Sequence, residues 1–360
     1  MAINNFFEGL KVVELASVLA GPAVGMFFAE LGAEVIKFEN KATNGDVTRS
    51  WKLATEPANS PDSAYFHAVN WGKQHHFVNF HDAEDCSMIL DTIKDAAIVI
   101  ANFRGNAAEK YGLDYHNLQQ TNPSLIYCNL TGYGANNDRP AYDIVLQAET
   151  GYLSMNGIDE ANLCRMPVAL IDVLAAHQMK EAILIALLKK MKTGHGSNLT
   201  VSLYDTAIAS LTNQATNYLI AGHIPKPLGC KHPNIAPYGD LMYCADGRKI
   251  VLAVGSDQQF AALCSVLGIA EIAQSQTFKH NESRVAHRDA LVQLLKEKFA
   301  TQPATTWMTK LLEAGVPAGI VKKIDEVFED QEAQSLLLET VDDGRRNRRV
   351  RSVIFKEQNA

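Results

Sequence analysis

The sequence lacks the short motifs that identify several common enzyme classes. It contains no GxGxxG fingerprint of a dinucleotide site, no Walker A loop, no GxSxG nucleophile turn and no HExxH pair of zinc ligands. None of its six cysteines forms a CxxC pair or another zinc spacing. These absences argue against a standard dinucleotide site, a P-loop site, an α/β-hydrolase site and a zinc site. We therefore expect no bound metal, and cysteines that remain reduced thiols.

Neither an excess of positive charge nor a long apolar run is present. The net charge of −7 at pH 7 argues against general binding of nucleic acids, which requires a basic face. The strongest basic run, residues 345–349, is expected to be a solvated surface segment. The first ten residues, MAINNFFEGL, do not have the pattern of a signal peptide, and the apolar stretch 183–188 is too short to span a bilayer. We expect a cytoplasmic protein that binds neither nucleic acid nor membrane.

The sequence does contain an alternation of apolar strands and helices. Small-residue and proline signals place a helix from Pro22 to Leu31, with Gly32 as its stop. Strands are expected at residues 11–15, 34–38, 76–80, 97–101 and 125–130, and further helices at 83–94 and 115–120. Such alternation predicts an α/β fold in which a parallel sheet carries helices on both faces.

The length of 360 residues predicts two or three domains. A long helix at 173–192, a strand at 199–203 and a helix at 205–221 precede residues 222–239, which are rich in Gly, Pro and His and have no periodicity. Beyond them, a strand at 249–254 and helices at 258–267, 288–300 and 305–314 indicate a small α+β domain. We expect a large domain at 1–205, a helix and crossing linker at 206–239, a small domain at 240–325, and a C-terminal segment at 326–360 that returns towards the large domain.

Two loops that follow predicted strands carry residues suited to a ligand. Residues 16–22 are small and lead into a helix, where free backbone N–H groups attract anions, although a plain tight turn would look the same. Asn102, Phe103 and Arg104 follow a buried strand, at the sheet edge where ligands bind in α/β folds. Lys110 lies two turns further on if this segment is helical. A capped helix start with surface charges explains these residues equally well.

Asp172 is the most informative single residue. It interrupts the apolar stretch 168–176, at the point where the long helix begins. Aspartate is a favoured N-cap, and capping alone would explain it. A helix N-terminus also favours the ionised carboxylate, and such a carboxylate in an apolar pocket can carry an acyl group covalently. The two roles are compatible, so the sequence leaves both open.

Several longer motifs follow one another at characteristic spacings. They are residues 9–15 (GLKVVEL), 20–22 (AGP), 31–39 (LGAEVIKFE), 45–49 (GDVTR), 102–104 (NFR), 122–127 (NPSLIY), 131–134 (TGYG), 142–143 (YD), 147–148 (QA), Gly151, 192–196 (KTGHG), 232–238 (HPNIAPY) and 246–247 (DG). In this order the chain, over about residues 8–330, resembles the class III CoA-transferases. That family includes formyl-CoA:oxalate and carnitine CoA-transferases, and α-methylacyl-CoA racemases are related to it.

The resemblance implies an enzyme that moves CoA from an acyl-CoA thioester to a carboxylic acid through a mixed anhydride on Asp172. It also implies a Rossmann-like large domain and an interlocked homodimer in which each chain threads through the other. Coenzyme A serves as substrate and carrier, and no metal is needed. The family's CoA-contacting positions fall on Val18, Leu19, Ala20, Asn40, Asn79, His81, Asn102, Phe103, Arg104, Lys110, Arg139, Tyr142 and Asp143.

Some positions depart from the family pattern. Asn40 stands where many members carry a basic residue for the adenosine end of CoA. Leu19 stands where oxalate-type members carry Gln, so formyl-CoA and oxalate are less expected as substrates, and the sequence does not identify donor or acceptor. The usual C-terminal segment with Pro-Pro and Leu-Gly-x-His is absent. One alternative is therefore a CoA-binding protein without activity, although the presence of Asp172 argues against it.

The other alternative is a racemase of the same fold. Those relatives use a histidine and an aspartate as paired acid and base on the α-carbon. The position of their histidine is occupied here by Tyr142. A tyrosine, with a reference pKa of about 10, is a poor base at neutral pH, so the sequence favours transfer over racemisation.

Overall fold

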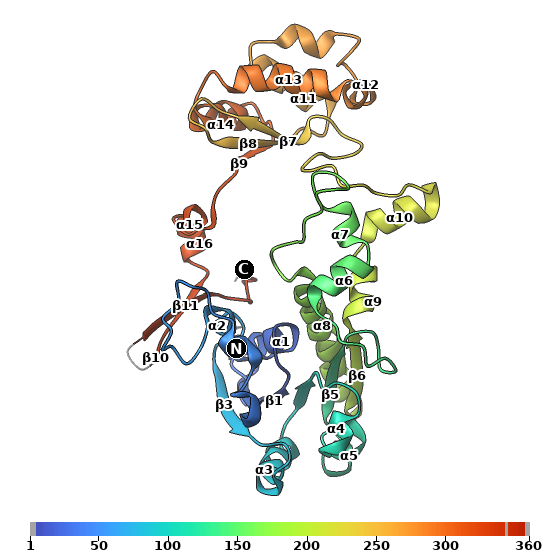
Figure 1. Ribbon diagram of the computed structural model, residues 1–360, viewed down its shortest axis with the longest axis vertical. Helices are drawn as coiled ribbons and strands as arrows, with labels where there is room; N and C mark the ends of the chain where they lie inside the picture. Colours follow the sequence, from blue (N-terminus) through green and yellow to red (C-terminus); the bar gives the residue numbers. More distant parts are fainter. Residues whose placement is uncertain (1–4, 343–344, 357–360) are drawn as a thin grey trace. The chain divides into compact units, whose positions relative to one another are not determined.

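A computed structural model describes residues 5–342 and 345–356 (Figure 1). The chain forms two compact units. The large unit comprises the residues up to 153, residues 165–224 and the residues from 335 onwards, and the small unit comprises 154–164 and 225–334. The predicted division at 205, 239 and 325 remains a prediction. The amino-terminal stretch used in the signal-peptide argument includes residues 1–4, which lie outside the described residues.

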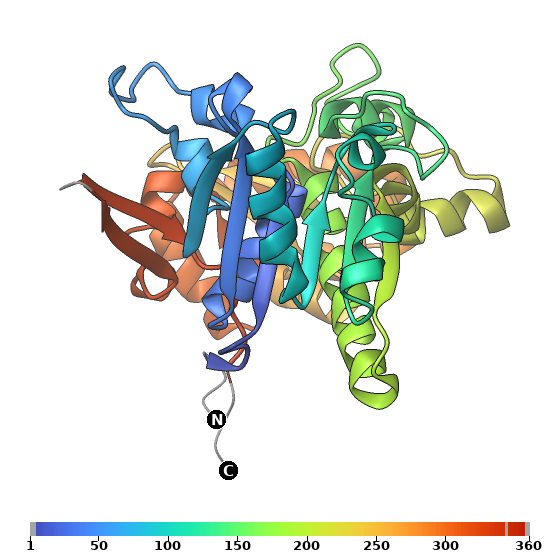
Figure 2. The ribbon, with the colours of Figure 1, turned by 90° about the horizontal axis from the view of Figure 1, so that it is seen from below.

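The large unit is built on a six-stranded sheet whose neighbouring strands are all parallel, so the predicted α/β class is confirmed (Figures 1 and 2). The strand order is β3-β2-β1-β4-β5-β6. The strands are β1 (Lys11–Leu15), β2 (Glu34–Asn40), β3 (Lys73–Val78), β4 (Ile98–Ala101), β5 (Ile126–Thr131) and β6 (Ser197–Ser202).

Helices cover both faces of this sheet, as the alternation of elements predicts. Val12 and Val13 are both fully buried and point to opposite faces, because successive strand residues alternate. Val12 belongs to a core shared with α1 (Ala20–Glu30), α8 (Leu170–Thr193) and α9 (Leu203–Ala209). Val13 belongs to a second core with α3 (Ala83–Lys94) and α5 (Tyr115–Thr121).

The strand order reverses direction between β1 and β4. From β1 the chain adds β2 and β3 on one side, and from β4 it adds β5 and β6 on the other. In an open α/β sheet, the loops after the two strands at such a point diverge and leave a crevice for a ligand. The loops at residues 16–19 and 102–106 therefore mark the expected binding edge.

The large unit contains several further helices. They are η2 (Lys41–Thr43), η3 (Val47–Ser50), α2 (Ala64–His67), α4 (Ala107–Lys110), α6 (Asp143–Glu149) and α10 (Thr212–Ala221), with α7 (Tyr152–Met155) crossing the boundary between the units. The helix expected at 205–221 is in fact two helices, α9 and α10, because Thr212 adopts a φ of +43° that interrupts it. Among the described residues, no helix is both long enough and apolar enough to cross a membrane.

Arg346 and Arg348 of the basic run at 345–349 are exposed, as predicted for a surface segment, but the run has regular structure. It forms strand β11 (Arg345–Val350), which pairs with β10 (Leu337–Asp342) in an antiparallel hairpin. Arg346 and Arg348 both form ion pairs with Glu339. Arg349 is buried. The hairpin thus pairs two of these arginines with one glutamate and leaves both arginines exposed.

The small unit has its own core and an antiparallel sheet in the order β7-β8-β9. Its elements are β7 (Tyr238–Tyr243), β8 (Lys249–Ala253), α11 (Asp257–Val266), η4 (Ala270–Gln274), α12 (Asn281–Ala286), α13 (Arg288–Phe299), α14 (Ala304–Glu313), β9 (Ala318–Ile320), α15 (Ile324–Val327) and α16 (Gln331–Gln334). Arg284 is fully buried there and donates hydrogen bonds to the carbonyls of Ala236 and Phe278. The segment that leads into β7 is therefore held by the core of its own unit.

Candidate active site

The two loops at the strand-order reversal are joined directly. The backbone N–H of Ser17 donates to Oδ1 of Asn102 at 3.1 Å, and Nδ2 of Asn102 donates back to the carbonyl of Ser17 at 2.9 Å. One asparagine side chain thus satisfies both backbone groups of one residue across the crevice. The structure brings together the two loops that the sequence singled out separately.

A cavity of about 750 Å³ opens at this edge of the sheet. Its wall comes from the ends of β1 and β2, from η3 and from the loop after β4. Of the predicted CoA-contacting residues it includes Asn40, Asn102, Phe103 and Arg104. The side chain of Asn40 is engaged locally, because its Oδ1 accepts the N–H of Ala42 at the start of η2. It therefore serves a different task from the basic residue common at this position.

A second cavity, of about 310 Å³, adjoins the first. The two cavities share Asn102, Phe103 and Arg104, and the second adds Arg139 and Tyr142. Nε of Arg104 donates to the carbonyl of Asp138 at 2.9 Å, so the loop after β4 is tied to the loop that precedes α6. Together the cavities form a space of the size that a nucleotide-containing ligand requires.

Helix α1 begins beside this space without a side-chain cap. Leu19 is its N-cap residue and makes no capping hydrogen bond. Within the part of the chain that the structure describes, the N–H groups of Ala20 and Gly21 have no acceptor. A Cβ on Gly21 would lie only 2.4 Å from Cβ of Ala16, so glycine is required for the helix to start this close to the loop. Free N–H groups at a helix start favour an anion or a polarised carbonyl oxygen.

Asp172 does not cap α8, so that expectation is wrong. The helix begins at Leu170 with Ala169 as its N-cap residue, which puts Asp172 in the first turn. The capping hydrogen bond comes from another element, because Oδ1 of Asp143 on α6 accepts the N–H of Ile171 at 2.7 Å. A buried carboxylate one residue after Tyr142 therefore fixes the start of the helix that carries Asp172.

The carboxylate of Asp172 is left without a partner. Among the described residues, no side chain or backbone group donates a hydrogen bond to it, and it forms no ion pair with any of them. Burial, together with the negative charge of Asp143, raises the pKa of Asp172 to about 7. Asp172 is not among the residues that line the two cavities. A half-buried, unpaired carboxyl group with a pKa near neutrality is nevertheless a candidate functional group.

Tyr65 is a site residue that the sequence did not reveal. It lies on α2 and packs edge-on against Trp51, with ring centroids 5.1 Å apart. Burial raises the pKa of its hydroxyl group, and the charges of Asp172, Asp143 and Asp46 raise it further. These carboxylates come from segments far apart in the sequence, and only the fold brings them near one phenol.

The other predicted residues occupy varied positions. Arg139 forms an ion pair with Glu149 and lies over the ring of Tyr133, whose hydroxyl donates to the same carboxylate. Lys110 is exposed at the end of α4. The remaining predicted residues lie outside the walls of the two cavities. Val18 and Leu19 lie in the loop after β1, Ala20 is the first residue of α1, and Asn79 and His81 follow β3.

Comparison with known proteins gives one consistent result. The sequence profile of CoA-transferase family III matches residues 7–358. A succinate–glutarate CoA-transferase from Agrobacterium fabrum is 37% identical over 334 residues, which cover 91% of this chain and 83% of that protein. A succinyl-CoA:glutarate CoA-transferase from Homo sapiens is 33% identical over 331 residues, covering 91% and 74% of the two chains. A crystal structure of a CaiB/BaiF family protein from Brucella suis matches with a TM-score of 0.85 at 36% identity, covering 98% of this chain and 93% of that one.

Proposed function

Because the chain belongs to CoA-transferase family III and is a CoA-transferase, we propose that it moves CoA between short dicarboxylic acids. In this proposal Asp172 is the residue that carries the acyl group and CoA covalently. The dicarboxylate class is supported by the two relatives above, whose names give succinate and glutarate as the acids exchanged. The observation that carries the role of Asp172 is its half-buried carboxylate, which has a raised pKa and no partner among the described residues.

The proposed reaction consists of four acyl transfers. A carboxylate oxygen of Asp172 attacks the thioester carbonyl of the donor, the C–S bond breaks, and CoA leaves as thiolate while a mixed anhydride forms. The thiolate then attacks the aspartyl carbonyl, which releases the donor acid and leaves an aspartyl-CoA thioester. The acceptor carboxylate attacks this thioester and regenerates a mixed anhydride and thiolate. Attack of the thiolate on the acceptor carbonyl yields the new acyl-CoA and free Asp172.

The start of α1 supports these steps electrostatically. Each attack places negative charge on a carbonyl oxygen, and fixed N–H donors aimed at that oxygen lower the barrier. The N–H groups of Ala20 and Gly21 are free to act in this way. For nucleophilic attack Asp172 must be ionised, so its pKa near 7 makes the proposed reaction favour neutral and alkaline pH.

The two adjoining cavities are proposed to hold CoA. Phe103 and Arg104 line both of them, and Arg104 and the exposed Lys110 offer positive charge for the phosphates. Asn79, His81 and Arg139 are further proposed contacts. CoA enters as substrate and product, and the steps above require no metal.

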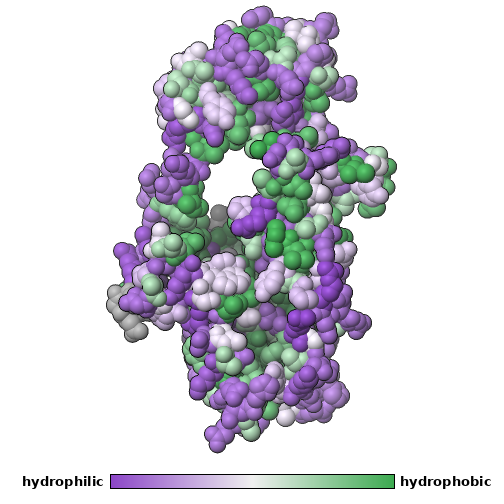
Figure 3. All heavy atoms as spheres, in the orientation of Figure 1, coloured by the Kyte–Doolittle hydropathy of each residue, from purple (hydrophilic) through white to green (hydrophobic). Residues whose placement is uncertain are grey.

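We also propose that the enzyme is a homodimer that works in the cytoplasm. Helix α8 exposes Ile185, Leu188 and Met191 at successive turns, and Met191 is 83% exposed. Helix α10 exposes Leu219 and Ile220, and hydrophobic residues are visible on the surface over this helix (Figure 3). An apolar stripe of this kind is typical of a surface that a partner covers. All six cysteines lie within the described residues, and each is a free thiol, as a reducing compartment allows.

The proposal is tested by mass spectrometry. The purified protein is mixed with a set of acyl-CoA thioesters and isotopically labelled dicarboxylic acids, and exchange of CoA is followed by mass. Trapping with hydroxylamine during turnover should modify the peptide that contains Asp172 and no other. Asp172→Ala should bind CoA but neither exchange it nor become modified. Normal exchange by this variant, or an adduct on another residue, would contradict the proposed role.

A further inference from the structure

The loop between β1 and α1 has a backbone conformation that its sequence does not favour. Val18 has a φ of +76°, in the left-handed region. A β-branched residue there crowds its own backbone and costs on the order of 1–3 kcal/mol, so it persists only where surrounding groups impose it. The question is which groups hold residues 16–18 in this shape.

Each of these three residues is held by a side chain from another part of the large unit. Both carboxylate oxygens of Asp46 accept the N–H of Val18, at 3.2 and 3.1 Å. Nζ of Lys37 donates to the carbonyl of Ala16 at 2.7 Å. Asn102 bonds both backbone groups of Ser17, as described above. The strained residue is thus the one that Asp46 controls.

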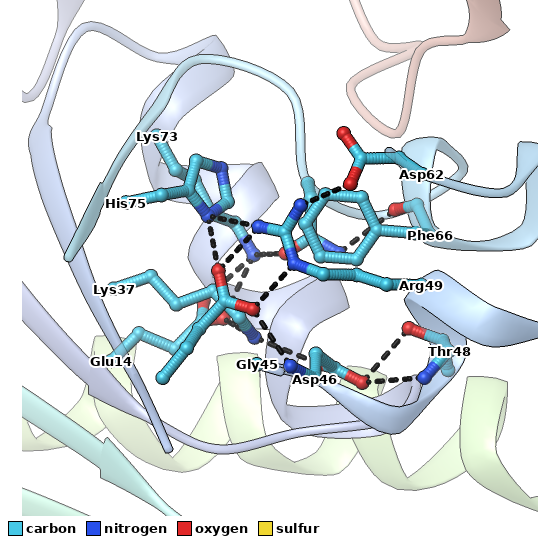
Figure 4. A network of polar contacts seen from close by, with 12 residues as sticks. Glu14, Lys37, Gly45, Asp46, Thr48, Arg49, Asp62, Phe66, Lys73 and His75 are labelled. Atoms are coloured by element: carbon cyan, nitrogen blue, oxygen red, sulfur yellow. Dashed lines mark hydrogen bonds and ion pairs between the residues drawn. The ribbon is translucent and has the colours of Figure 1, made fainter. Parts of the chain in front are cut away.

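Asp46 is itself rigidly placed (Figure 4). Its carboxylate accepts hydrogen bonds from Nζ of Lys37 at 3.1 Å and from the backbone N–H and Oγ1 of Thr48 at 3.1 and 2.8 Å. Its own N–H donates to Oε2 of Glu39 at 2.7 Å. Asp46 is only 4% exposed and Lys37 is fully buried. Rotation of the Asp46 side chain would therefore break several bonds at once.

The surrounding charges compensate one another. Lys37 and Lys73 both lie 2.8 Å from a carboxylate oxygen of Glu14, so two ammonium groups face the carboxylates of Glu14 and Asp46. Burial disfavours the charged form of Lys37, but Glu14 and Asp46 outweigh it and raise the pKa of Lys37. The charges of these four side chains balance, which favours a geometric over an electrostatic effect of Asp46 on the reaction.

We propose that Asp46 is a positioning residue that, together with Lys37, locks Val18 in its left-handed conformation and thereby fixes the start of α1 against the thioester. This inference rests on the proposed function, because it concerns the N–H groups of Ala20 and Gly21 in the acyl transfers. Without the bond from Asp46, Val18 relaxes to negative φ and the following peptides turn away. A displacement of about 1 Å at a reacting centre can reduce a rate by about 10²-fold.

The test begins with Asp46→Asn in the full-length protein. Asparagine keeps the shape of the side chain but replaces one acceptor oxygen by an NH₂ group. At the place of Oδ2 this group meets the ammonium of Lys37, and at the place of Oδ1 it meets the backbone N–H of Thr48, so in either orientation the carboxylate's hold on Val18 is weakened from two accepting oxygens to one and a supporting bond is lost. We expect kcat and the rate of adduct formation on Asp172 to fall about 10- to 100-fold, with a much smaller change in the Kd of CoA. A purely electrostatic role would do the opposite. The variant adds one positive charge to the cluster, so CoA binding would tighten while kcat stayed unchanged.

Asn122→Ala provides a matched structural control. Asn122 is also a buried clamp, and its Nδ2 donates to the carbonyls of Ile93 and Ala96 at 3.1 and 2.8 Å. It acts before β4 and β5, at the sheet edge opposite the cavities. We expect both variants to lower the melting temperature, but only Asp46→Asn to lower kcat. Equal kcat losses in the two variants would overturn the proposal, because they would trace to general destabilisation.

A second pair of variants, in a protein that carries Val18→Gly, separates the effect of Asp46 on the loop from its effect on stability. Glycine adopts positive φ without strain, so in the Val18→Gly background the loop depends less on Asp46. Asp46→Asn should therefore lower kcat by a factor at least several-fold smaller in the Val18→Gly protein than in the protein that keeps Val18. An equal ratio in both backgrounds would refute a role through Val18. Adduct formation on Asp172 in the wild type tests the proposed function separately, since it does not depend on either variant.

Discussion

Replacing Asp172 by asparagine should make the folded protein more stable at neutral and alkaline pH, although it removes the proposed nucleophile. The carboxylate has no partner among the described residues and does not cap its helix, so the substitution removes a poorly solvated charge and no hydrogen bond. A residue that served the fold alone would behave in the opposite way.

The direction and size of the effect follow from proton binding. Burial raises the pKa of Asp172 from 3.8 to about 7 in the folded chain, so between these values the folded chain binds more protons than the unfolded chain. The free energy of unfolding of the wild type therefore falls as the pH rises from about 4 to about 7. At about 1.4 kcal/mol per pH unit, the full difference is about 4 kcal/mol. Loss of the favourable interaction between the ionised group and the helix N-terminus offsets about 0.3–1 kcal/mol.

The assay is the melting temperature of both proteins from pH 4 to pH 9. We expect the two values to converge near pH 4 and the variant to gain steadily up to pH 7. At higher pH the gain should be constant, at about 6–12 °C for a net 3 kcal/mol in a unit of this size. CoA exchange should be lost at every pH.

Asp205→Asn is the matched control. Asp205 occupies the same third helical position, in α9, but its side chain is exposed. Removing its charge should lower the melting temperature slightly, because only the interaction with the helix N-terminus is lost. If Asp172→Asn is no more stable than the wild type at pH 8, or if its gain does not depend on pH, then Asp172 is not a buried, unpaired carboxylate.

Three further predictions concern the reaction, the ligand and the assembly. In the wild type, kcat/KM should rise with pH through about 7 and then level off, because Asp172 must be ionised; a flat profile from pH 5 to 8 would contradict this assignment. Arg104→Ala and Lys110→Ala should weaken CoA binding, and the loss should shrink with added salt because exposed charges are screened beyond a Debye length of ~8 Å. Unchanged Kd at low salt in both variants, measured by calorimetry, would remove these residues from the site. Light scattering at micromolar concentration should give the mass of a dimer. The double variant Met191→Glu, Ile220→Glu should give a mass closer to that of a monomer. An active wild-type monomer would refute the proposed homodimer.

The sequence predicts the sheet well because apolar strand runs are a local signal. Residues 11–15 are β1 itself, and 34–38 fall within β2. The third strand lies at 73–78 rather than 76–80, because Lys73 and His75 face Glu14 and Glu39, polar partners that no local pattern reveals. The same limit applies to Lys37. In the strand it looks like an exposed break in an apolar run, yet it is fully buried between Glu14 and Asp46.

The candidate site was predictable where function depends on one residue and its position at the end of a strand. Asn102 can be found in this way, whereas Asp172, in the first turn of α8, can be found because it interrupts an apolar stretch. The sequence could not reveal that Asp143 would cap the helix of Asp172, because the two carboxylates lie on α6 and α8. Tyr65 and Asp46 were missed for the same reason, since each gains its neighbours only through packing of distant segments.

The capping bond from Asp143 makes the orientation of the proposed nucleophile, Asp172, depend on a neighbouring loop. Tyr142 forms part of the wall of the smaller cavity, and the next residue holds the first turn of α8 by a single 2.7 Å hydrogen bond to Ile171. Any ligand that shifts Tyr142 therefore pulls on the turn that carries Asp172. Tyr142 is thus connected to the proposed nucleophile by a short path of two peptide bonds and one hydrogen bond.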